Sequence, residues 1–322
     1  MDSGEVIYND KTAFGKVIEL KGERIFTDSM MDPRVSGMLL KEDKLVFQYD
    51  SDPPFVLFQL QAMSFVAQKG KRGNGPDEFI FPRLVPTTDK NLICYILELT
   101  NRKLYTLDNH NQITCYPFKL SDSGVGSEMP LVNVGKDEFM YVESSFNGKS
   151  VFRTIKTNDS IYSKEIYNLN LKPDLDSWVP YIGDFAVNVS KNRMVYAYKY
   201  YKIISFMDLD ANNVKTINFK QSEFDEATLH VADGLDLNVT HYFGVCGQSD
   251  YIYFIYSGRK PSETWKEETS NCYIEQYDWD GNPIRKFRLD HFGRFVVDEK
   301  NKRLYLSNPR EDDPIYVYTL SD

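Results

Sequence analysis

Residues 277–283 read Tyr277-Asp-Trp-Asp-Gly-Asn-Pro283, an Asp/Asn/Gly turn between two aromatic-rich runs of alternating residues. The same unit returns along the chain, most plainly in Tyr105-Thr-Leu-Asp-Asn-His-Asn-Gln112 and in Phe206-Met-Asp-Leu-Asp-Ala-Asn-Asn213. Short alternating runs bounded by such turns predict β-hairpins. A four-stranded unit that repeats, and that must stack on copies of itself, is typical of a β-propeller.

The repeats divide the chain into six blades of four antiparallel strands. The last blade is one strand short at the C-terminal end, and residues 14–20 have the pattern of an outer strand, so we expect this N-terminal strand to close the last blade. Such closure removes an exposed sheet edge. We therefore predict an all-β, six-bladed β-propeller as a single domain over residues 1–322; a pair of β-sandwich domains is the alternative, but no Pro/Ser/Gly-rich linker divides the chain. The predicted blades cover residues 35–69, 84–120, 131–167, 184–220, 242–290, and 294–320 together with 14–20.

Composition limits the function classes. The 322 residues include 22 Tyr and 21 Phe, residues that favour pleated, half-buried surfaces. The formal net charge of −9 argues against a nucleic-acid partner, because duplex binding needs clustered Lys and Arg. We expect no transmembrane segment, and residues 1–6 lack the basic and apolar regions of a signal peptide. We also expect a monomer without a cofactor.

Four cysteines are predicted to remain free thiols: Cys94, Cys115, Cys246 and Cys272. In the predicted blades each pair is separated by one intervening strand, about 9.6 Å, which exceeds the roughly 7 Å Cα limit of a disulfide. None has the spacing of a zinc site. We expect them to act as buried small hydrophobic residues.

The connections between blades are the longest loops of the chain. They span residues 70–83, 121–130, 168–183 and 221–241, and in a propeller they emerge on the same face as the loops between second and third strands. The longest of these, residues 258–271, adds to that face. Because long loops often carry function, we expect one binding surface, over the central channel, on this long-loop face.

Two glycine- and aspartate-containing segments resemble ligand loops but are interpreted as turns. Gly70, Gly73 and Gly75 could form an anion nest, yet the Lys-Ser/Thr ending of a P-loop is missing, and a turn that lets Phe79 wedge between blades is favoured. Asp278-Trp-Asp-Gly281 matches only the start of a calcium loop and is interpreted as a hairpin turn. The acidic segment 221–241 could bind a metal or form a solvated lid; we favour the lid and predict no metal site.

The segment Gly70-Lys-Arg-Gly-Asn-Gly-Pro-Asp-Glu-Phe79, followed by Phe81-Pro82, resembles a Gly-x-Gly-Pro-Gly-Glu-Phe…Pro signature of six-bladed propellers. It is similar to the TolB-like and NHL-like group of gut Bacteroidetes, as is Ile25-Phe-Thr-Asp-Ser-Met-Met-Asp-Pro33, although Asp77 stands where that group usually has Gly. The resemblance implies a propeller that is either non-enzymatic or uncharacterised, with no established catalytic residues to carry over. It also implies a cell-envelope location, periplasmic or lipid-anchored, after removal of a leader.

Residues that come just before or at the start of each blade's first strand are candidate ligand contacts, because these positions surround the channel mouth. Charge-assisted hydrogen bonds and stacking from such a ring would suit an anionic or sugar-like ligand. The alternative is that these residues only line a water-filled channel. Two tryptophans of the long-loop face, Trp178 and Trp265, are candidate surface anchors. The ring consists of Arg34, Arg83, Tyr181, His241 and His291.

These features favour a non-enzymatic binding propeller that recognises a protein, peptide or carbohydrate on its long-loop face. The alternative is a channel-centred, metal-dependent hydrolase or lactonase. That enzyme would need a calcium ion held by Glu, Asp and Asn at the inner strand ends, whereas the predicted ring supplies Arg, Tyr and His. We therefore expect no catalytic residue.

Overall fold

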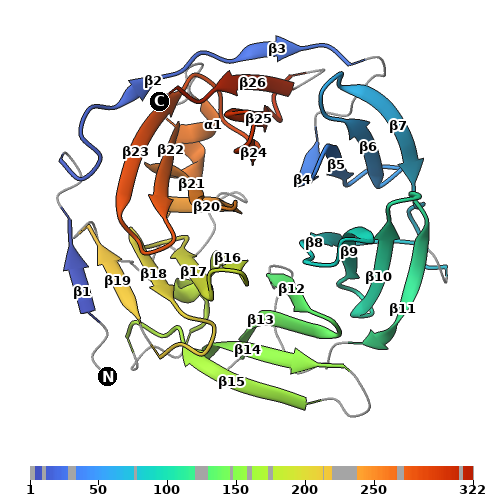
Figure 1. Ribbon diagram of the computed structural model, residues 1–322, viewed down its shortest axis with the longest axis horizontal. Helices are drawn as coiled ribbons and strands as arrows, with labels where there is room; N and C mark the ends of the chain where they lie inside the picture. The colour runs from blue at the N-terminus through green and yellow to red at the C-terminus, as the bar shows by residue number, and fades with distance from the viewer. Residues whose placement is uncertain are drawn as a thin grey trace.

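Six β-sheets surround a central axis in the computed structural model (Figure 1). The first strands of neighbouring sheets contact each other in a continuous circle, β4–β8–β12–β16–β20–β24 and back to β4. The prediction of a six-bladed, all-β propeller is therefore confirmed. The structure describes residues 4–8, 12–27, 34–75, 78–119, 130–145, 148–157, 162–172, 177–212, 214–219, 238–266, 272–311 and 315–321.

Blades 1 to 3 each contain four strands that are consecutive in sequence. Blade 1 is β4 (Val35–Lys41), β5 (Lys44–Tyr49), β6 (Phe55–Gln59) and β7 (Ser64–Lys69). Blade 2 is β8 (Pro82–Val85), β9 (Leu92–Glu98), β10 (Lys103–Asp108) and β11 (Ile113–Lys119). Blade 3 is β12 (Leu131–Gly135), β13 (Glu138–Ser144), β14 (Ser150–Lys156) and β15 (Tyr162–Asn168).

Blades 4 to 6 also receive strands from the N-terminal segment. Blade 4 is β16 (Gly183–Asn188), β17 (Arg193–Tyr198), β18 (Ile203–Met207) and β19 (Lys215–Asn218), with β1 (Gly4–Ile7) parallel to β19. Blade 5 is β20 (Thr240–Gly247), β21 (Tyr251–Arg259), β22 (Cys272–Asp278) and β23 (Pro283–Leu289), with β2 (Ile18–Glu19) parallel to β23. Blade 6 is β24 (Arg294–Asp298), β25 (Arg303–Ser307), β26 (Ile315–Thr319) and β3 (Glu23–Ile25).

The closing strand differs from the predicted one. An N-terminal strand does complete the last blade, but it is β3, antiparallel to β26, and not residues 14–20. Those residues divide instead: Phe14 packs against Phe219 and Tyr277 between blades 4 and 5, and β2 lies on blade 5. Every blade offers a similar outer edge, so alternation alone could not tell which edge a short strand pairs with.

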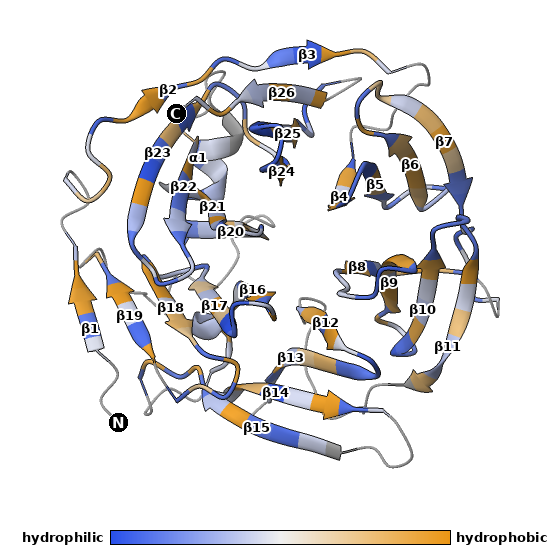
Figure 2. Cartoon of the chain, in the orientation of Figure 1, coloured by the Kyte–Doolittle hydropathy of each residue, from blue (hydrophilic) through white to orange (hydrophobic). Residues whose placement is uncertain are grey.

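Aromatic side chains fill the spaces between blades. Phe79 is fully buried and makes edge-to-face contacts with Phe55 of blade 1 and Tyr105 of blade 2, at centroid distances of 5.2 and 5.0 Å. The predicted wedge is therefore confirmed. Gly70 permits it with a φ of +77°, a conformation that L side chains rarely adopt. Hydrophobic and hydrophilic residues are mixed along outer strands such as β15 and β23 (Figure 2).

The aspartate turns are hairpin turns, as predicted. The Oδ1 atoms of Asp108, Asp208 and Asp278 each accept hydrogen bonds from two backbone N–H groups of their own turn, at 2.8–3.1 Å. Such side-chain to backbone hydrogen bonds are the usual role of Asp at the start of a turn.

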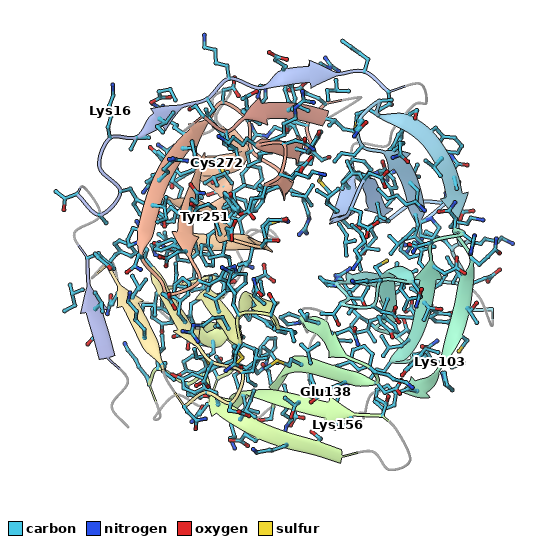
Figure 3. The ribbon with its side chains drawn as sticks, viewed as in Figure 1. Lys16, Lys103, Glu138, Lys156, Tyr251 and Cys272 are labelled. Atoms are coloured by element: carbon cyan, nitrogen blue, oxygen red, sulfur yellow. The ribbon has the colours of Figure 1, made fainter. Side chains whose placement is uncertain are left out.

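All four cysteines are free, which confirms the prediction. Burial raises the pKa of the Cys94 thiol to about 12, and Cys272 lies inside blade 5 (Figure 3). The expected buried role holds for Cys94 and Cys272, whereas Cys246 is partly buried and Cys115 is exposed on the outer strand β11. At a blade's outermost strand one face looks toward solvent, so a strand residue there need not be buried.

Candidate functional site

The N-terminal ends of the inner strands carry the predicted ring residues. Arg34 directly precedes β4, Arg83 lies in β8 and His241 lies in β20. Tyr181 ends a short 3-10 helix (Val179–Tyr181) before β16, and His291 precedes β24. The propeller therefore places all five at one end of the ring, but their environments separate them into three groups.

Tyr181 is buried and holds a loop together. Its hydroxyl donates to the carbonyl of Lys172, and its own carbonyl accepts from the Tyr196 hydroxyl at 2.5 Å. Trp178, one of the two predicted anchors, lies one turn earlier and is only half-buried. Trp265, the other anchor, belongs to the helix α1 (Pro261–Lys266), but its side chain lies outside the described residues.

His241 is also buried, between blades 4 and 5. Its backbone N–H donates to the carbonyl of Lys199 at 2.7 Å, and its ring stacks on Tyr256 at 6.0 Å. Tyr256 in turn forms one wall of a charged cluster, which we call the Glu275 cluster. His241 therefore contacts an internal network.

The Glu275 cluster joins two lysines to one carboxylate. The ammonium groups of Lys202 and Lys286 lie 3.4 and 2.9 Å from Glu275 Oε1. The hydroxyls of Tyr242 and Tyr277 donate to Glu275 Oε2 at 3.0 and 3.3 Å. Burial, then the Glu275 charge, raises the pKa of Tyr242 well above its ordinary value, so this hydroxyl remains a donor.

Aromatic rings surround the two ammonium groups. The Lys202 Nζ atom lies 4.4 Å from the Phe219 ring centroid and 4.1 Å from that of Tyr256. The Lys286 Nζ atom lies 4.8 and 4.9 Å from the centroids of Tyr256 and Tyr273. Such cation–π contacts partly replace the water that these charges lose on burial.

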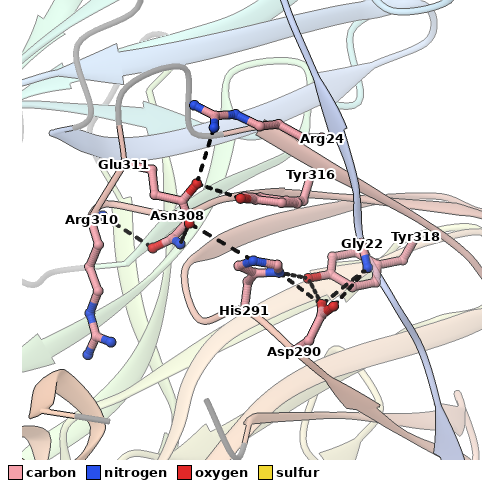
Figure 4. Close-up of polar contacts among 9 residues, drawn as sticks. All are labelled: Gly22, Arg24, Asp290, His291, Asn308, Arg310, Glu311, Tyr316 and Tyr318. Carbon is pink, nitrogen blue, oxygen red and sulfur yellow. Dashed lines mark hydrogen bonds and ion pairs between the residues drawn. The ribbon is translucent and has the colours of Figure 1, made fainter. Parts of the chain in front are cut away.

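His291 belongs to a different, half-exposed network at the junction of blades 5 and 6, shown in Figure 4. Its Nδ1 atom lies 2.9 Å from Asp290 Oδ1 and 3.1 Å from the Tyr318 hydroxyl. Its Nε2 atom lies 4.0 Å from Glu311 Oε1, and its ring stacks on Tyr316 at 3.7 Å. We call this set the His291 cluster.

Both carboxylates of the His291 cluster also hold the N-terminal segment. Asp290 accepts the backbone N–H of Gly22 at 3.1 Å, and Glu311 lies 3.8 Å from the Arg24 guanidinium (Figure 4). Burial and the hydrogen bond to Glu311 raise the pKa of Tyr316 to about 12, so its hydroxyl remains a donor to Glu311. The cluster thus ties β3 to blade 6.

The two ring arginines, Arg34 and Arg83, begin neighbouring blades, and a third arginine, Arg294, which was not among the predicted ring residues, begins the blade before them. Arg34 and Arg294 are exposed and Arg83 is half-buried, and the strands β24, β4 and β8 that they begin are neighbours in the circle. We call Arg34, Arg83 and Arg294 the arginine arc. Within the described residues it combines two exposed arginines and one half-buried arginine from three successive blades.

A buried carboxylate shapes the loop beside the arginine arc. Glu98, only 1% exposed, accepts hydrogen bonds from the backbone N–H groups of Ile80, Phe81 and Thr100 at 2.9–3.2 Å. This fixes the backbone at Phe81, whose ring is 55% exposed. A large exposed aromatic side chain therefore lies two residues from Arg83.

No group of three or more His, Cys, Asp or Glu side chains suited to a metal ion occurs in the described part of the chain. The acidic residues between 221 and 237, where either a metal or a lid was considered, lie outside the described residues. Likewise, among the residues described, no helix is long and apolar enough to cross a membrane.

Comparison with known proteins identifies the family. The profile of the family described as TolB-like 6-blade propeller-like matches residues 14–300. The chain belongs to this family. The resemblance seen in the Gly70–Phe79 signature is thereby confirmed. Among curated proteins, none matches the chain.

Solved structures show how far the fold of this TolB-like propeller is shared. A DUF4221-family member from Bacteroides vulgatus has a TM-score of 0.62 at 14% identity, covering 95% of this chain and 98% of its own. A protein assigned as exported, from Bacteroides fragilis, has a TM-score of 0.60 at 13% identity, with 99% of each chain covered. A calcium-binding protein, regucalcin, from Agrobacterium tumefaciens has a TM-score of 0.52 at 11% identity, covering 94% of each chain. At these identities the likeness concerns the fold alone.

The Glu275 cluster was not anticipated from the sequence, although a signal existed. Cys272-Tyr-Ile-Glu-Gln-Tyr-Asp278 falls within the predicted blade 242–290, and in a propeller a strand inside a blade is covered by neighbouring blades on both faces. A Glu in its middle must therefore be buried and paired. Its lysine partners could not be inferred, because Lys202 belongs to a different blade.

Proposed function

We propose that this TolB-like propeller is a non-enzymatic binding module whose long-loop face recognises an acidic ligand. That ligand is either a carbohydrate or a peptide segment, in each case one that carries carboxylates. The observation that carries the proposal is the arginine arc beside the exposed Phe81. Guanidinium groups bind carboxylates through paired hydrogen bonds, and an aromatic face stacks on sugar rings or apolar side chains. Tyr181 and His241 are assigned to internal support of the same face.

The net charge of the protein favours local, specific binding of an acidic ligand over general attraction of polyanions. With a formal net charge of −9, the molecule repels polyanions at long range. Binding of an acidic ligand would then depend on the local arc. A location in the cell envelope fits this role and is supported by the relative assigned as exported.

A direct test uses immobilised protein with two acidic probes, oligogalacturonate and an oligoglutamate peptide, and with neutral dextran as a reference. We expect one acidic probe to bind, and Arg83→Ala or Arg34→Ala to weaken it about tenfold each, as removal of an interface arginine commonly does. Lys90→Ala, on the opposite face of blade 2, is the matched control and should not change affinity.

The same experiment can reject the proposal. Equal loss of binding in Lys90→Ala, or no binding of either acidic probe, would contradict it. Protein purified without chelator should also be assayed for bound divalent metal. A stoichiometric metal ion, together with hydrolysis of a lactone or ester substrate, would contradict the binding-module proposal and favour the channel-centred enzyme.

A further inference from the structure

The last blade is closed by a short segment that is held by a few backbone pairs and by side chains of blades 5 and 6. We call residues 18–25, which contain β2 and β3, the closing strap. Its backbone pairs with blade 5 over two residues and with blade 6 over three, and Leu20 N–H donates to the Arg288 carbonyl at 2.9 Å. Lys16, just before the strap, points outward at the rim (Figure 3). So few backbone pairs, at an exposed rim, describe a segment that can open locally.

The His291 cluster grips this strap at two points. Gly22 N–H is held by Asp290, and Asp290 is in turn bonded to Tyr318 and His291, at 2.8 and 2.9 Å. Arg24 faces Glu311, whose other carboxylate oxygen accepts a hydrogen bond from the Asn308 amide at 2.8 Å. The first grip reaches the loop 308–311 of blade 6 through His291, whose Nε2 atom lies 4.0 Å from Glu311 Oε1, and the second reaches it through Glu311 itself. This loop belongs to the long-loop face.

Hydrogen bonds connect that loop to helix α1. The backbone N–H of Arg310 donates to the side-chain oxygen of Asn308 at 3.2 Å, and the Arg310 guanidinium donates to the carbonyl of Thr264 in α1. Thr264 is buried, and its hydroxyl lies 3.2 Å from that of Ser257 in β21. An unbroken set of polar contacts thus runs from the outer strap to a helix on the long-loop face.

We propose that the closing strap and helix α1 are energetically coupled through Asp290, His291, Glu311 and Arg310, so that loosening one loosens the other. Release of the strap frees Asp290 and Glu311 to move, and with them the loop that places the Arg310 guanidinium on Thr264. Coupling between two sites is reciprocal by thermodynamic necessity. This coupling goes beyond the proposed binding role and does not depend on a bound ligand.

The test is hydrogen–deuterium exchange of the full chain with two variants at opposite ends. Arg310→Ala should speed exchange in the strap at least fivefold, because it removes the guanidinium contact to Thr264 that links the loop to α1. Asp290→Asn should speed exchange in residues 261–266 to a similar extent. Asp280→Asn is the control, because Asp280 is an exposed carboxylate on the opposite face, paired with Arg193.

The outcomes are distinguishable. If Arg310→Ala changes exchange only in α1 and Asp290→Asn only in the strap, the coupling is refuted. It is also refuted if Asp280→Asn has the same effects, since the change would then reflect global loosening. Should Arg310→Ala fail to fold, Arg310→Lys keeps the charge but loses the planar fork, and a fivefold change in the strap is again expected.

Discussion

Two polar clusters, one blade apart, each combine carboxylates with cationic and tyrosine side chains, but they differ in burial. In the Glu275 cluster the side chains of Glu275 and Lys202 are 0% exposed and that of Lys286 is 7% exposed. In the His291 cluster the side chains of His291, Asp290 and Glu311 are 23, 38 and 31% exposed. The first fixes blades 4 and 5 together, whereas the second holds a strap that lies on the rim.

The comparison indicates that burial, rather than the number of contacts, decides whether a charged cluster affects global stability or only local opening. Removing one partner from a buried ion pair leaves an uncompensated charge in a medium that solvates it poorly. At a half-exposed site, water replaces the lost partner. We therefore expect the Glu275 cluster to govern global stability and the His291 cluster to govern local opening.

The largest effect is expected from Glu275→Gln. Both lysines lose their shared carboxylate, so the free energy of unfolding should fall by about 3–5 kcal/mol, the usual cost of breaking a buried pair. Urea denaturation measures it. A triple variant, Glu275→Leu with Lys202→Met and Lys286→Met, removes all three charges and should recover much of the loss. No recovery would show that packing, and not charge, dominates this cluster.

Phe14→Ala should come next, because Phe14 is buried against Phe219 and Tyr277 and lies 5.7 Å from Lys286 Nζ. Truncation of a buried Phe costs about 3 kcal/mol or more. Thermal unfolding should show the loss, and Phe14→Leu, which keeps most of the volume, should recover over half of it. A melting temperature unchanged by Phe14→Ala would mean that the N-terminal segment does not stabilise the propeller.

A smaller effect is expected from Asp290→Asn. It weakens the bonds to Gly22 N–H and His291 at a half-exposed site, so the free energy of unfolding should fall by about 1 kcal/mol. Urea denaturation gives the value. If the loss equals that of Glu275→Gln, the two clusters do not differ in the way that burial predicts.

The smallest effect is expected from Arg193→Ala. Arg193 lies 2.9 Å from Asp280, but this pair is largely exposed, and exposed pairs contribute about 0–1 kcal/mol. The same denaturation series should place it within about 0.5 kcal/mol of the unmodified protein. A larger loss would indicate that contacts across the blade 4–5 boundary matter even when solvated.

Much of the fold could be predicted because the propeller repeats a local pattern. Strands such as β9 (Leu92–Glu98), β10 (Lys103–Asp108), β14 (Ser150–Lys156) and β22 (Cys272–Asp278) lie within the predicted blades 84–120, 131–167 and 242–290. Their ends are set by turn residues that act within a few positions in the chain. The assignment of residues 14–20 to the last blade was wrong, because a two- or three-residue strand carries too little pattern to choose among equivalent edges.

The candidate site was predictable in position but not in environment. Arg34, Arg83, Tyr181, His241 and His291 do lie at one end of the ring, because chain direction in each blade fixes that end. Whether a side chain there is exposed or buried depends on residues from the next blade. Tyr256 covers His241, and Tyr316 covers His291. Arg294, the third member of the arginine arc, was not among the predicted ring residues.

The repeat, the blade count, the hairpin turns and the face of the long loops are encoded locally, since they follow from alternation and chain direction. Three features depend instead on how the blades pack: the N-terminal segment covers three blades, Glu275 binds lysines from two blades, and the His291 cluster holds the strap. These features join residues up to 269 positions apart, as Glu19 and Arg288 are. Packing between blades brings such residues together, and no local pattern records it.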